Sequence, residues 1–390
     1  MPKFFHVDLQ LINPAFTSPL LDVLTDLEYL RRLQLSGTTP FPVFLQLKRL
    51  FHLLESLASA RIEGNHTTLS DYVETRIADD GNGAKDESWR EINNVSEAMN
   101  FVESEIQPGA VITQQFVREL HALTVKNLTR EGDKTPGAFR MSQVRIAQAE
   151  HLPPDAIQVP SYMEELIQFI NQQDPSKYDL IKIALAHHRF AWIHPFGNGN
   201  GRVVRLLTYS MLVKYGFQVD ALGGLLNPAA VFCADRERYY TMLAQADAGG
   251  EENLERWCSY VLTGVRDEMR KIEKLTHHDY LKSKILIPAL AFAREREHIT
   301  TDEYSVLLAA TNAPTGFIKA GDLSKALPKR NGTQRTYLIQ KLLKTKLLQP
   351  IRPNARQYHL GFANTLLIRG VVRTLRSEGF ISDALAGGSL

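Results

Sequence analysis

The sequence predicts an all-α helical bundle with a small β-hairpin flap, followed by a small domain of helix-turn-helix type. Three observations lead to this expectation. Apolar residues recur with helical periodicity over most of the chain up to about residue 271. One segment, 139–160, alternates instead, and the residues after 286 read as helix, turn, helix and two short strands. At 390 residues, the chain is long enough for more than one domain.

The composition is that of an ordinary globular protein, with 44% hydrophobic and 23% charged residues. The net charge of +2 does not by itself point to a partner. Two cysteines, Cys233 and Cys258, are too few for a disulfide framework, so buried thiols in a reducing compartment are expected. The first residues lack the pattern of a signal peptide and no window resembles a membrane span, so we expect a cytoplasmic protein without membrane attachment.

The helical pattern is clearest over 42–64, where five apolar residues share one stripe. These residues are Leu47, Leu50, Phe51, Leu54 and Leu57. Gly64 is a candidate cap at the end of this helix. Further helices are expected over 88–106, 113–128, 178–193, 201–216 and 236–275, the last with a break at Gly249 and Gly250.

The segment 139–160 departs from the helical pattern. Residues 143–148 alternate between polar and apolar, and an extended pattern resumes at 156–160 after Pro153 and Pro154. This arrangement predicts a β-hairpin or an extended flap.

The chain changes character after residue 271. Residues 271–285 are expected to form a helical connector, and residues 286–390 have the element order of a winged helix-turn-helix domain. Between residues 319 and 356 there are ten lysines or arginines and one acidic residue, Asp322. This part of the chain is therefore basic, while the rest is slightly acidic.

Two interpretations of this basic domain remain open. In the first, the helix at 332–346 enters the major groove of DNA, with Arg335 and Lys341 near bases or phosphates. In the second, the domain mediates protein contacts or dimerisation. Its lysines are then a solvated face, and its core face consists of Leu338, Leu342, Leu343 and Leu347.

The segment 192–205, with the sequence WIHPFGNGNGRVVR, carries the strongest chemical pattern. Its glycines allow backbone conformations closed to other residues and a close approach of the backbone to a ligand. A helix follows at once, and its free amides and positive dipole end favour an anion such as phosphate. Arg202 and Arg205 share a face of that helix, and guanidinium groups match phosphate oxygens. His194 lies at the entrance of the loop, where it could accept a proton from a hydroxyl.

A plainer interpretation of the same residues is a helix stop followed by a flexible glycine turn. Two known phosphate motifs do not apply. No Gly-Lys-Ser/Thr follows, so the loop is not a Walker A motif. A helix rather than a strand precedes the glycines, which excludes a dinucleotide fingerprint.

The segment resembles the core motif of the Fic/Doc family, His-Pro-Phe-x-(Asp/Glu)-Gly-Asn-Gly-Arg-x-x-Arg. The matching residues are His194, Pro195, Phe196, Gly199, Asn200, Gly201, Arg202 and Arg205. The residues 135–146 resemble the entry to the family's flap, and 236–246 resemble its later helix beside the nucleotide. The resemblance covers about residues 100–265, and it implies a Fic catalytic core over 100–270 and an N-terminal helical region over 1–99.

The resemblance implies transfer of AMP from ATP, with Mg²⁺, to a Ser, Thr or Tyr hydroxyl of a target protein. By position, His194 would be the general base and Phe196 would anchor the loop. The phosphates would be held by the amides of Gly199, Asn200 and Gly201, by Arg202 near the β-phosphate and by Arg205 at the γ-phosphate.

The resemblance also assigns roles outside the loop. Val144, Ile146 and Ala147 would lie beside the nucleotide, in a flap that aligns the target backbone by β-augmentation. Tyr239 and Tyr240 would lie near the nucleotide, although packing within an amphipathic helix explains them equally well. Some relatives carry an asparagine at the position of Asp247, so that nucleotide contact is in doubt.

The sequence departs from the family at Asn198, where the metal-binding residue is Asp or Glu. An amide oxygen can coordinate Mg²⁺ but brings no negative charge. Three readings follow: weaker Mg²⁺ binding, a different donor or metal, or a binding protein with low transfer. The first predicts that Asn198→Asp tightens Mg²⁺ binding and raises transfer.

The end of the helix at 42–64 resembles the family's inhibitory motif, (Ser/Thr)-x-x-x-Glu-(Gly/Asn). Ser59, Glu63 and Gly64 match it. The resemblance implies that Glu63 pairs with Arg205 and takes the place of the γ-phosphate. Inhibition would then act within the same chain.

The expected function is therefore a self-inhibited protein adenylyltransferase, with possible self-modification and a homodimeric state as in many relatives. One alternative within the same fold is transfer of another phosphate-containing group, or removal of AMP. The other is a nucleotide-sensing DNA-binding regulator with weak or absent transfer. The substitution at Asn198 keeps that second alternative open.

Overall fold

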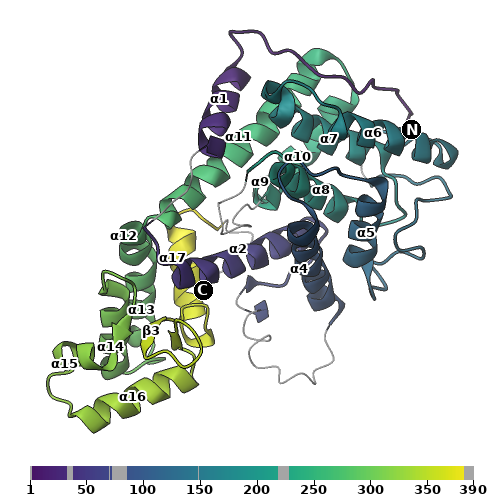
Figure 1. Cartoon of the computed structure of the whole chain (residues 1–390). Helices are drawn as coiled ribbons and strands as arrows, with labels where there is room; N and C mark the ends of the chain where they lie inside the picture. Colours follow the sequence, from purple (N-terminus) through teal and green to yellow (C-terminus); the bar gives the residue numbers. More distant parts are fainter. Residues whose placement is uncertain are drawn as a thin grey trace.

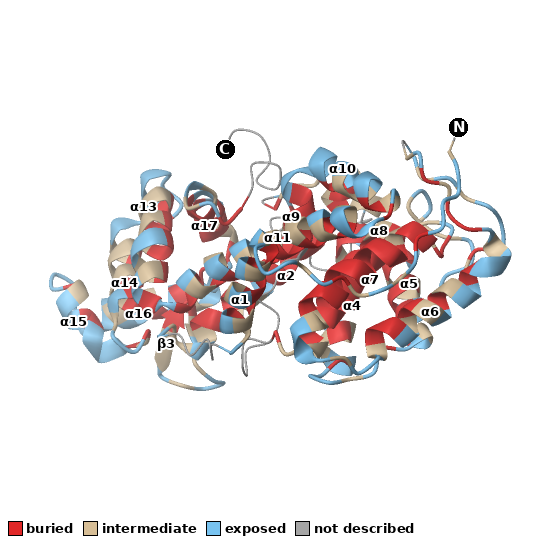
Figure 2. Cartoon of the chain, turned by 90° about the horizontal axis from the view of Figure 1, so that it is seen from above, coloured by how far each residue is buried: buried red, intermediate tan, exposed pale blue. Residues whose placement is uncertain are grey.

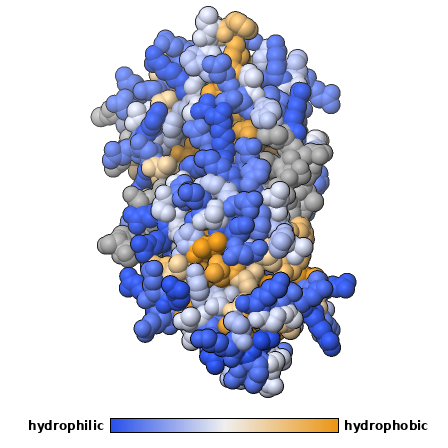
Figure 3. All heavy atoms as spheres, turned by 90° about the vertical axis from the view of Figure 1, so that its left-hand side faces the viewer, coloured by the Kyte–Doolittle hydropathy of each residue, from blue (hydrophilic) through white to orange (hydrophobic). Residues whose placement is uncertain are grey.

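The protein consists of a large helical part and a smaller C-terminal part, seen at the upper right and lower left of Figure 1. The structure is a computed structural model that describes residues 2–32, 38–69, 71–72, 86–147, 149–217 and 228–381. In both parts, buried apolar side chains form the core. None of the helices in the described ranges is long and apolar enough to cross a membrane. The face shown in Figure 3 is largely hydrophilic, with small apolar areas.

The large part is a bundle of α-helices, as the apolar periodicity predicts. Its helices are α1 (Pro19–Arg32), α2 (Phe41–Ile62), α4 (Glu87–Glu105), α5 (Gln114–Val125), α6 (Val159–Asn171), α7 (Asp179–Ile193), α8 (Asn200–Lys214), α9 (Pro228–Ala234), α10 (Arg236–Asp247) and α11 (Glu251–Thr276). The predicted break between the last two lies at Gly249 and Gly250, which both have positive φ. Both cysteines are buried and free.

Helices α7 and α8 form the centre of the bundle. Both are buried along nearly their whole length, as the red ribbons of Figure 2 show. They pack against each other, α6 and α11 cover α7, and α2, α4 and α5 contact α8. The turn that joins the two helices contains His194, so the bundle fixes this turn from several sides.

The C-terminal part combines short helices with a three-stranded sheet. Its elements are α12 (His278–Tyr280), a π-helical turn (Leu281–Leu286), α13 (Ile287–Glu295), α14 (Thr301–Asn312), β1 (Ile318–Lys319), α15 (Leu323–Ala326), α16 (Gly332–Lys344), β2 (Leu348–Pro350), β3 (Gln357–Leu360) and α17 (Thr365–Ser377). The strand order is β1-β3-β2, and both pairings are antiparallel. The two helices and two strands expected from the sequence are therefore present, with a third short strand that the sequence did not suggest.

Helix α2 contacts both parts of the molecule, between which it lies in Figure 1. Towards its N-terminal end, the buried side chain of Gln46 bonds to the loop after β3. Its C-terminal half packs on α4, α8 and α9. The helix ends where the sequence suggested, because Gly64 follows with φ of 99°, a conformation that glycine adopts without strain.

The expected β-hairpin flap is not present in the described residues between 139 and 160. Residues 143–146 have no regular secondary structure, and residues 156–158 form a 3-10 turn that leads into α6. The alternation that suggested a second strand therefore belongs to a helix start, which Pro160 favours at its first turn. The extended-flap interpretation fits residues 143–146.

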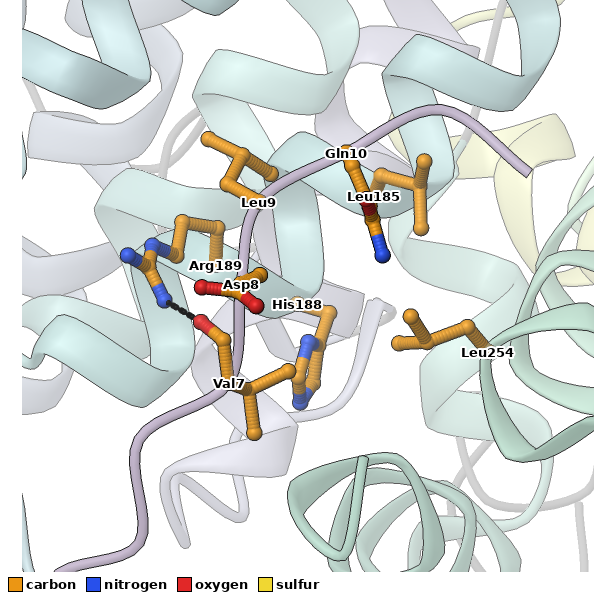
Figure 4. A pocket seen from close by; sticks show the side chains of 8 residues that line it. All are labelled: Val7, Asp8, Leu9, Gln10, Leu185, His188, Arg189 and Leu254. Carbon is orange, nitrogen blue, oxygen red and sulfur yellow. Dashed lines mark hydrogen bonds between the residues drawn. The ribbon is translucent and has the colours of Figure 1, made fainter. Parts of the chain in front are cut away.

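An N-terminal strap, residues 2–18, runs across the surface of the large part. Lys3 forms a parallel bridge with His151, which follows the extended residues 143–146 in the segment 139–160. Further along, the guanidinium group of Arg189 donates to the Val7 carbonyl at 2.5 Å. Figure 4 shows the small pocket under this strap, between Asp8, His188 and Leu254. No residue of the segment 192–205 lines this pocket.

Candidate active site

His194 ends α7 in a left-handed conformation, with φ of 50° and ψ of 61°. Its amide donates to the Phe190 carbonyl at 3.0 Å, as expected for a residue that closes a helix. The Nδ1 atom lies 3.4 Å from the Ala191 carbonyl, which can only accept a hydrogen bond. The proton therefore resides on Nδ1, and the lone pair of Nε2 remains available as a base.

Arg140 fixes the end of α7 to the flap. Its guanidinium group donates to the carbonyls of His194 at 2.8 Å and Ser142 at 3.0 Å, and also to that of Pro154. Its own amide donates to the Pro195 carbonyl at 2.9 Å. The buried Arg140 side chain thus joins Ser142 and Pro154, which lie on either side of the extended flap, to the backbone of the candidate base. The sequence offered no signal for this role, since Arg140 is one of two arginines in the segment 139–160.

An aromatic stack between Phe196 and His121 anchors the loop after His194 in the core. Phe196 is fully buried, and its ring lies 3.8 Å from that of His121 with an angle of 7° between the planes. The amide of Gly137 donates to His121 Nδ1, so Nε2 carries the proton and donates to the Asn198 carbonyl at 3.1 Å. Phe196 therefore anchors the loop in the core, and His121 is an additional support that the motif does not reveal.

Asn200 closes the loop on itself. Its side-chain oxygen accepts from the Phe196 amide and its side-chain nitrogen donates to the Phe196 carbonyl, both at 2.9 Å. Gly199 has φ of 75°, and a Cβ atom there would lie 2.8 Å from Val125. A side chain at position 199 would therefore be strained and would clash with α5.

Glu63 lies against the first turn of α8. The amides of Asn200 and Gly201 precede the first hydrogen bond of that helix, from Val203 N to Gly199 O at 3.1 Å. A Cβ atom on Gly201 would lie 2.2 Å from Glu63 Oε1, so only glycine leaves room for this carboxylate. Glu63 therefore occupies the helix terminus at which an anion is stabilised.

Arg205 connects α8 to the end of α2. Its Nη2 atom is 2.8 Å from Glu63 Oε1 and also donates to the Ser59 carbonyl at 2.8 Å. Its Nε atom donates to Ser59 Oγ at 2.9 Å. The side chain is only 1% exposed. The carboxylate–guanidinium contact between Glu63 and Arg205 is thus present, and Ser59 adds two hydrogen bonds to it.

Arg202 also has acidic neighbours. Its Nη1 atom lies 3.2 Å from Glu91 Oε1, and its Nη2 atom donates to the Glu131 carbonyl at 2.7 Å. Glu91 itself is 3% exposed and accepts a hydrogen bond from the Asn65 side chain at 2.9 Å. Both arginines of the motif are therefore paired with carboxylates.

The electrostatics favour a neutral base and an ionised Glu63. Burial lowers the pKa of His194 to about 4, despite the hydrogen bond to the Ala191 carbonyl. Burial acts to raise the pKa of Glu63, but the guanidinium groups of Arg205 and Arg202 outweigh it, so the pKa is lowered. At neutral pH the site thus contains a neutral imidazole beside a carboxylate–guanidinium pair.

Asn198 does not present a good donor set for Mg²⁺. Its side-chain oxygen accepts from the Gly199 amide at 2.7 Å, and its side-chain nitrogen lies 3.3 Å from the Gly132 carbonyl. Asp133, the carboxylate bound to the neighbouring loop amides, accepts hydrogen bonds on both of its oxygens. Mg²⁺ favours carboxylates with free lone pairs, and these residues do not fit that requirement.

Comparison with known proteins places this loop in a family. Residues 111–212 match the model of the Fic/DOC family. Over these residues the chain is similar to Fic domains. It is 30% identical over 219 residues to the protein adenylyltransferase Fic of Nematostella vectensis, covering 55% of this chain and 47% of that protein. The corresponding protein of Drosophila mojavensis is 31% identical over 196 residues, covering 49% and 36%. The chain thus spans less than half the length of these relatives.

The fold likeness extends beyond the Fic domain. The crystal structure of a Fic family protein from Desulfovibrio desulfuricans G20 superposes with a TM-score of 0.55 at 20% identity. It covers 89% of this chain and 97% of that chain. The arrangement of the helical core and of most of the remaining chain is therefore shared with a known Fic protein fold.

The described contacts do not tie the flap residues 144–147 to the loop at 194–201, and Tyr239 is buried in the core. Val144 and Ile146 are half-buried, Ala147 is exposed, and in the described part of the chain no hydrogen bond joins them to the loop. Tyr239 is 2% exposed and lies 2.9 Å from His187 Nε2, so it is a packing residue.

Tyr240 and Asp247 of α10 each contact a charged side chain of the protein. Tyr240 is 42% exposed, and the guanidinium group of Arg236 lies 5.4 Å from its ring centre. Asp247, whose role the sequence left in doubt, forms an ion pair with His188 at 2.9 Å. Of the tyrosine pair, only Tyr240 thus offers an accessible ring.

Buried histidines make the free energy of unfolding depend on pH. Burial lowers the pKa of His121 to about 4, below its ordinary value of 6.5. Between these values the unfolded chain binds a proton that the folded protein does not, so the free energy of unfolding should fall as the pH falls. His121 contributes up to about 1.4 kcal/mol per pH unit in this window. Urea denaturation at pH 7 and pH 5 measures the change.

The replacement His121→Gln should make this pH dependence shallower, and the same replacement at the exposed His66 should not. Equal pH dependence in the parent and in His121→Gln would show that the buried imidazole is not the cause.

Proposed function

We propose that this Fic-domain protein is a self-inhibited protein adenylyltransferase that transfers AMP from ATP to a Ser, Thr or Tyr hydroxyl of a target protein. The observation that carries the proposal is the Glu63 carboxylate at the N-terminus of α8, paired with Arg205 beside an unprotonated His194. A site that holds a carboxylate in this way is suited to a phosphate group of similar charge. The names of the relatives, protein adenylyltransferase Fic, support the same reaction.

In the proposed reaction the hydroxyl oxygen of the target attacks the α-phosphorus of ATP. A new P–O bond forms, the bond from the α-phosphorus to the bridging oxygen breaks, and pyrophosphate leaves. His194 Nε2 accepts the hydroxyl proton. Arg202, Arg205 and the first amides of α8 supply positive charge to the phosphates. The residues around Asn198 do not fit Mg²⁺.

Glu63 is proposed to act as a brake. Its carboxylate pairs with the guanidinium group of Arg205 and fills the space beside Gly201. The terminal phosphate of ATP would need the same guanidinium group and the same space, so it competes with Glu63. Productive binding of ATP requires Glu63 to leave. Inhibition within the same chain follows from the position of Ser59 and Glu63 at the end of α2.

Removal of the brake should raise transfer. We expect Glu63→Gly to increase AMP incorporation by about 10- to 100-fold, which corresponds to a coupling of about 1–3 kcal/mol between brake and nucleotide. Adding His194→Ala should reduce it by about 10²- to 10⁴-fold, because the base is lost. Incubation with α-labelled ATP measures both, and detects self-modification on the protein itself.

Glu63→Gln is the matched control, since it keeps the side-chain shape and removes the charge. It should lie between the parent and Glu63→Gly. Equal labelling of the parent and Glu63→Gly would exclude the brake. Labelling that persists without His194 would exclude the proposed base.

A second candidate function is nucleotide-dependent regulation through DNA binding by the C-terminal part, whose element order suggests a winged helix. One observation favours it. Several basic side chains around α16 are exposed and form no ion pair in the described part of the chain: Lys329, Lys344, Lys346, Arg352 and Arg356. Arg335 and Lys341, which the sequence favoured as DNA contacts, have protein partners instead. Arg335 Nε donates to the Leu327 carbonyl at 3.3 Å, and Lys341 pairs with Glu303 at 2.8 Å.

Binding of a labelled duplex at two salt concentrations tests this candidate. If the exposed lysines contact phosphates, Lys344→Ala/Lys346→Ala should lower the slope of log affinity against log salt by about 2. The same change at Arg335 should have a smaller effect on the slope. Absence of binding at low salt would exclude DNA as the partner and leave a homodimeric or protein-binding role for this part.

A further inference from the structure

Asn198 stands where the family motif that this segment resembles has an acid, and it has a different task in this chain. Asn198 uses both ends of its side-chain amide within the loop region. Its oxygen accepts from the Gly199 amide at 2.7 Å, and its nitrogen donates to the Gly132 carbonyl at 3.3 Å. A carboxylate at this position could not donate to Gly132 and would turn an oxygen towards that carbonyl. The amide at 198 is therefore matched to the neighbouring segment.

The same neighbouring segment supplies the carboxylate. Asp133 Oδ2 accepts from the amides of Gly197 at 3.0 Å and Asn198 at 3.1 Å, and its side chain is 6% exposed. Burial acts to raise the pKa of Asp133, but hydrogen bonds from Thr135 and Asn198 and the nearby imidazole lower it, so it stays ionised. A Cβ atom on Gly197 would lie 2.9 Å from Asp133 Oδ2, which shows how closely the two segments meet.

We propose that Asn198 and Asp133 form a clamp that closes the Fic loop in place of a metal-binding carboxylate, so that nucleotide binding here does not depend on a protein-held divalent cation. The inference rests on the proposed nucleotide-binding function. Asp133 already binds the backbone amide of residue 198, so a carboxylate at 198 would bring a second negative charge to the same segment, and like charges oppose each other. The residues at 198 and 133 thus complement each other: the negative charge lies on Asp133, and residue 198 is a neutral amide.

The test is a binding measurement in a Glu63→Gly background, so that the brake does not mask it. Calorimetry gives the affinity for a non-hydrolysable ATP analogue in EDTA and in MgCl₂. The clamp predicts that the ratio of the two dissociation constants stays within about threefold, which means little coupling between metal and nucleotide. The four proteins are the background, Asn198→Asp, Asp133→Asn and the double variant. Asp22→Asn, an exposed change on α1, is the matched control.

Each variant has a defined expectation. Asn198→Asp should lower the thermal midpoint without gaining Mg²⁺ dependence. The double variant should recover part of that midpoint and gain at least about tenfold in affinity from Mg²⁺. Two results would overturn the clamp: an affinity of the background that changes by more than about threefold between EDTA and MgCl₂, or Mg²⁺ dependence gained by Asn198→Asp alone at no cost in midpoint.

Failure of the proposed function is distinguishable from failure of the clamp. If no protein binds the analogue, the nucleotide-binding function is contradicted, and the thermal midpoints alone judge the clamp. Midpoint shifts of Asn198→Asp and Asp133→Asn that simply add in the double variant would then overturn it.

A separate observation concerns the regulation of the brake. Near the start of α2, the Gln46 side chain is 4% exposed and bonds to the last residue of β3 and to the loop after it. Its oxygen accepts from Phe362 N at 2.9 Å, and its nitrogen donates to Leu360 O at 2.8 Å. Glu63 follows seventeen residues later on the same helix, a distance of about 26 Å along the axis. One helix therefore carries both the brake and the contact to the C-terminal part.

We infer that the C-terminal part sets the brake through Gln46. Helix α2 is buried over most of its length and has no glycine, and its proline lies in the first turn, so it moves as a rod. A change at the loop after β3 is therefore transmitted to Glu63. This inference also rests on the proposed function, since it concerns the brake on the nucleotide site.

Gln46→Ala tests the coupling by labelling with α-labelled ATP and by affinity for the ATP analogue. It should raise both towards the values of Glu63→Gly, and should have no further effect when combined with Glu63→Gly. Arg49→Ala, an exposed change on the same helix, is the matched control and should leave both values unchanged.

Equal effects of Gln46→Ala with and without Glu63 would show a merely structural role and overturn the coupling. The coupling would also be overturned if Gln46→Ala showed the AMP labelling and the analogue affinity of the parent while Glu63→Gly was activated. If Glu63→Gly itself neither labels nor binds, the proposed function fails instead, and a coupling to it is excluded as well.

Discussion

The pairing of Arg205 with the end of α2 is the interaction on which the site depends. A guanidinium group that is 1% exposed must be matched by acceptors, because an unpaired buried charge is strongly unfavourable. Glu63 and Ser59 provide these acceptors, and both come from one helix. The same contact therefore orients α8, places α2 and fills the anion position at the helix terminus. Under the proposed function, stability and inhibition are combined in this one contact.

Carboxylates accompany both arginines of the motif and the loop amides. Glu63 faces Arg205, Glu91 faces Arg202, and Asp133 faces the loop amides. A site built to receive a polyphosphate would be rich in uncompensated positive charge when empty. Internal carboxylates balance that charge, and under the proposed function phosphate oxygens would replace them, which exchanges one set of charge-assisted hydrogen bonds for another.

The helical core could be predicted from the sequence because its apolar periodicity is long and regular, as in α2 and α7. The contact of Glu63 with Arg205 came from a motif, since no pattern of spacing relates residues so far apart. The flap was misjudged because alternation over 156–160 also fits the first turn of a helix.

Two supporting residues could not be found from the sequence at all. Arg140 and His121 act through partners that only the fold brings near, namely the last carbonyls of α7 and the ring of Phe196. Asp133 belongs with them, because a single aspartate in a polar loop carries no sign that it binds amides 64 residues away. Local rules describe elements, whereas contacts between elements depend on the complete packing.

The contacts of the site also differ widely in sequence separation, which affects the order in which the chain folds. The bonds between Phe196 and Asn200 span four residues, so the turn between α7 and α8 can form as soon as these helices meet. The contact between Glu63 and Arg205 spans 142 residues, and ordering a loop of that length costs more entropy. The turn that contains His194 is therefore a local structure that forms early, and the contact between Glu63 and Arg205 is among the late ones.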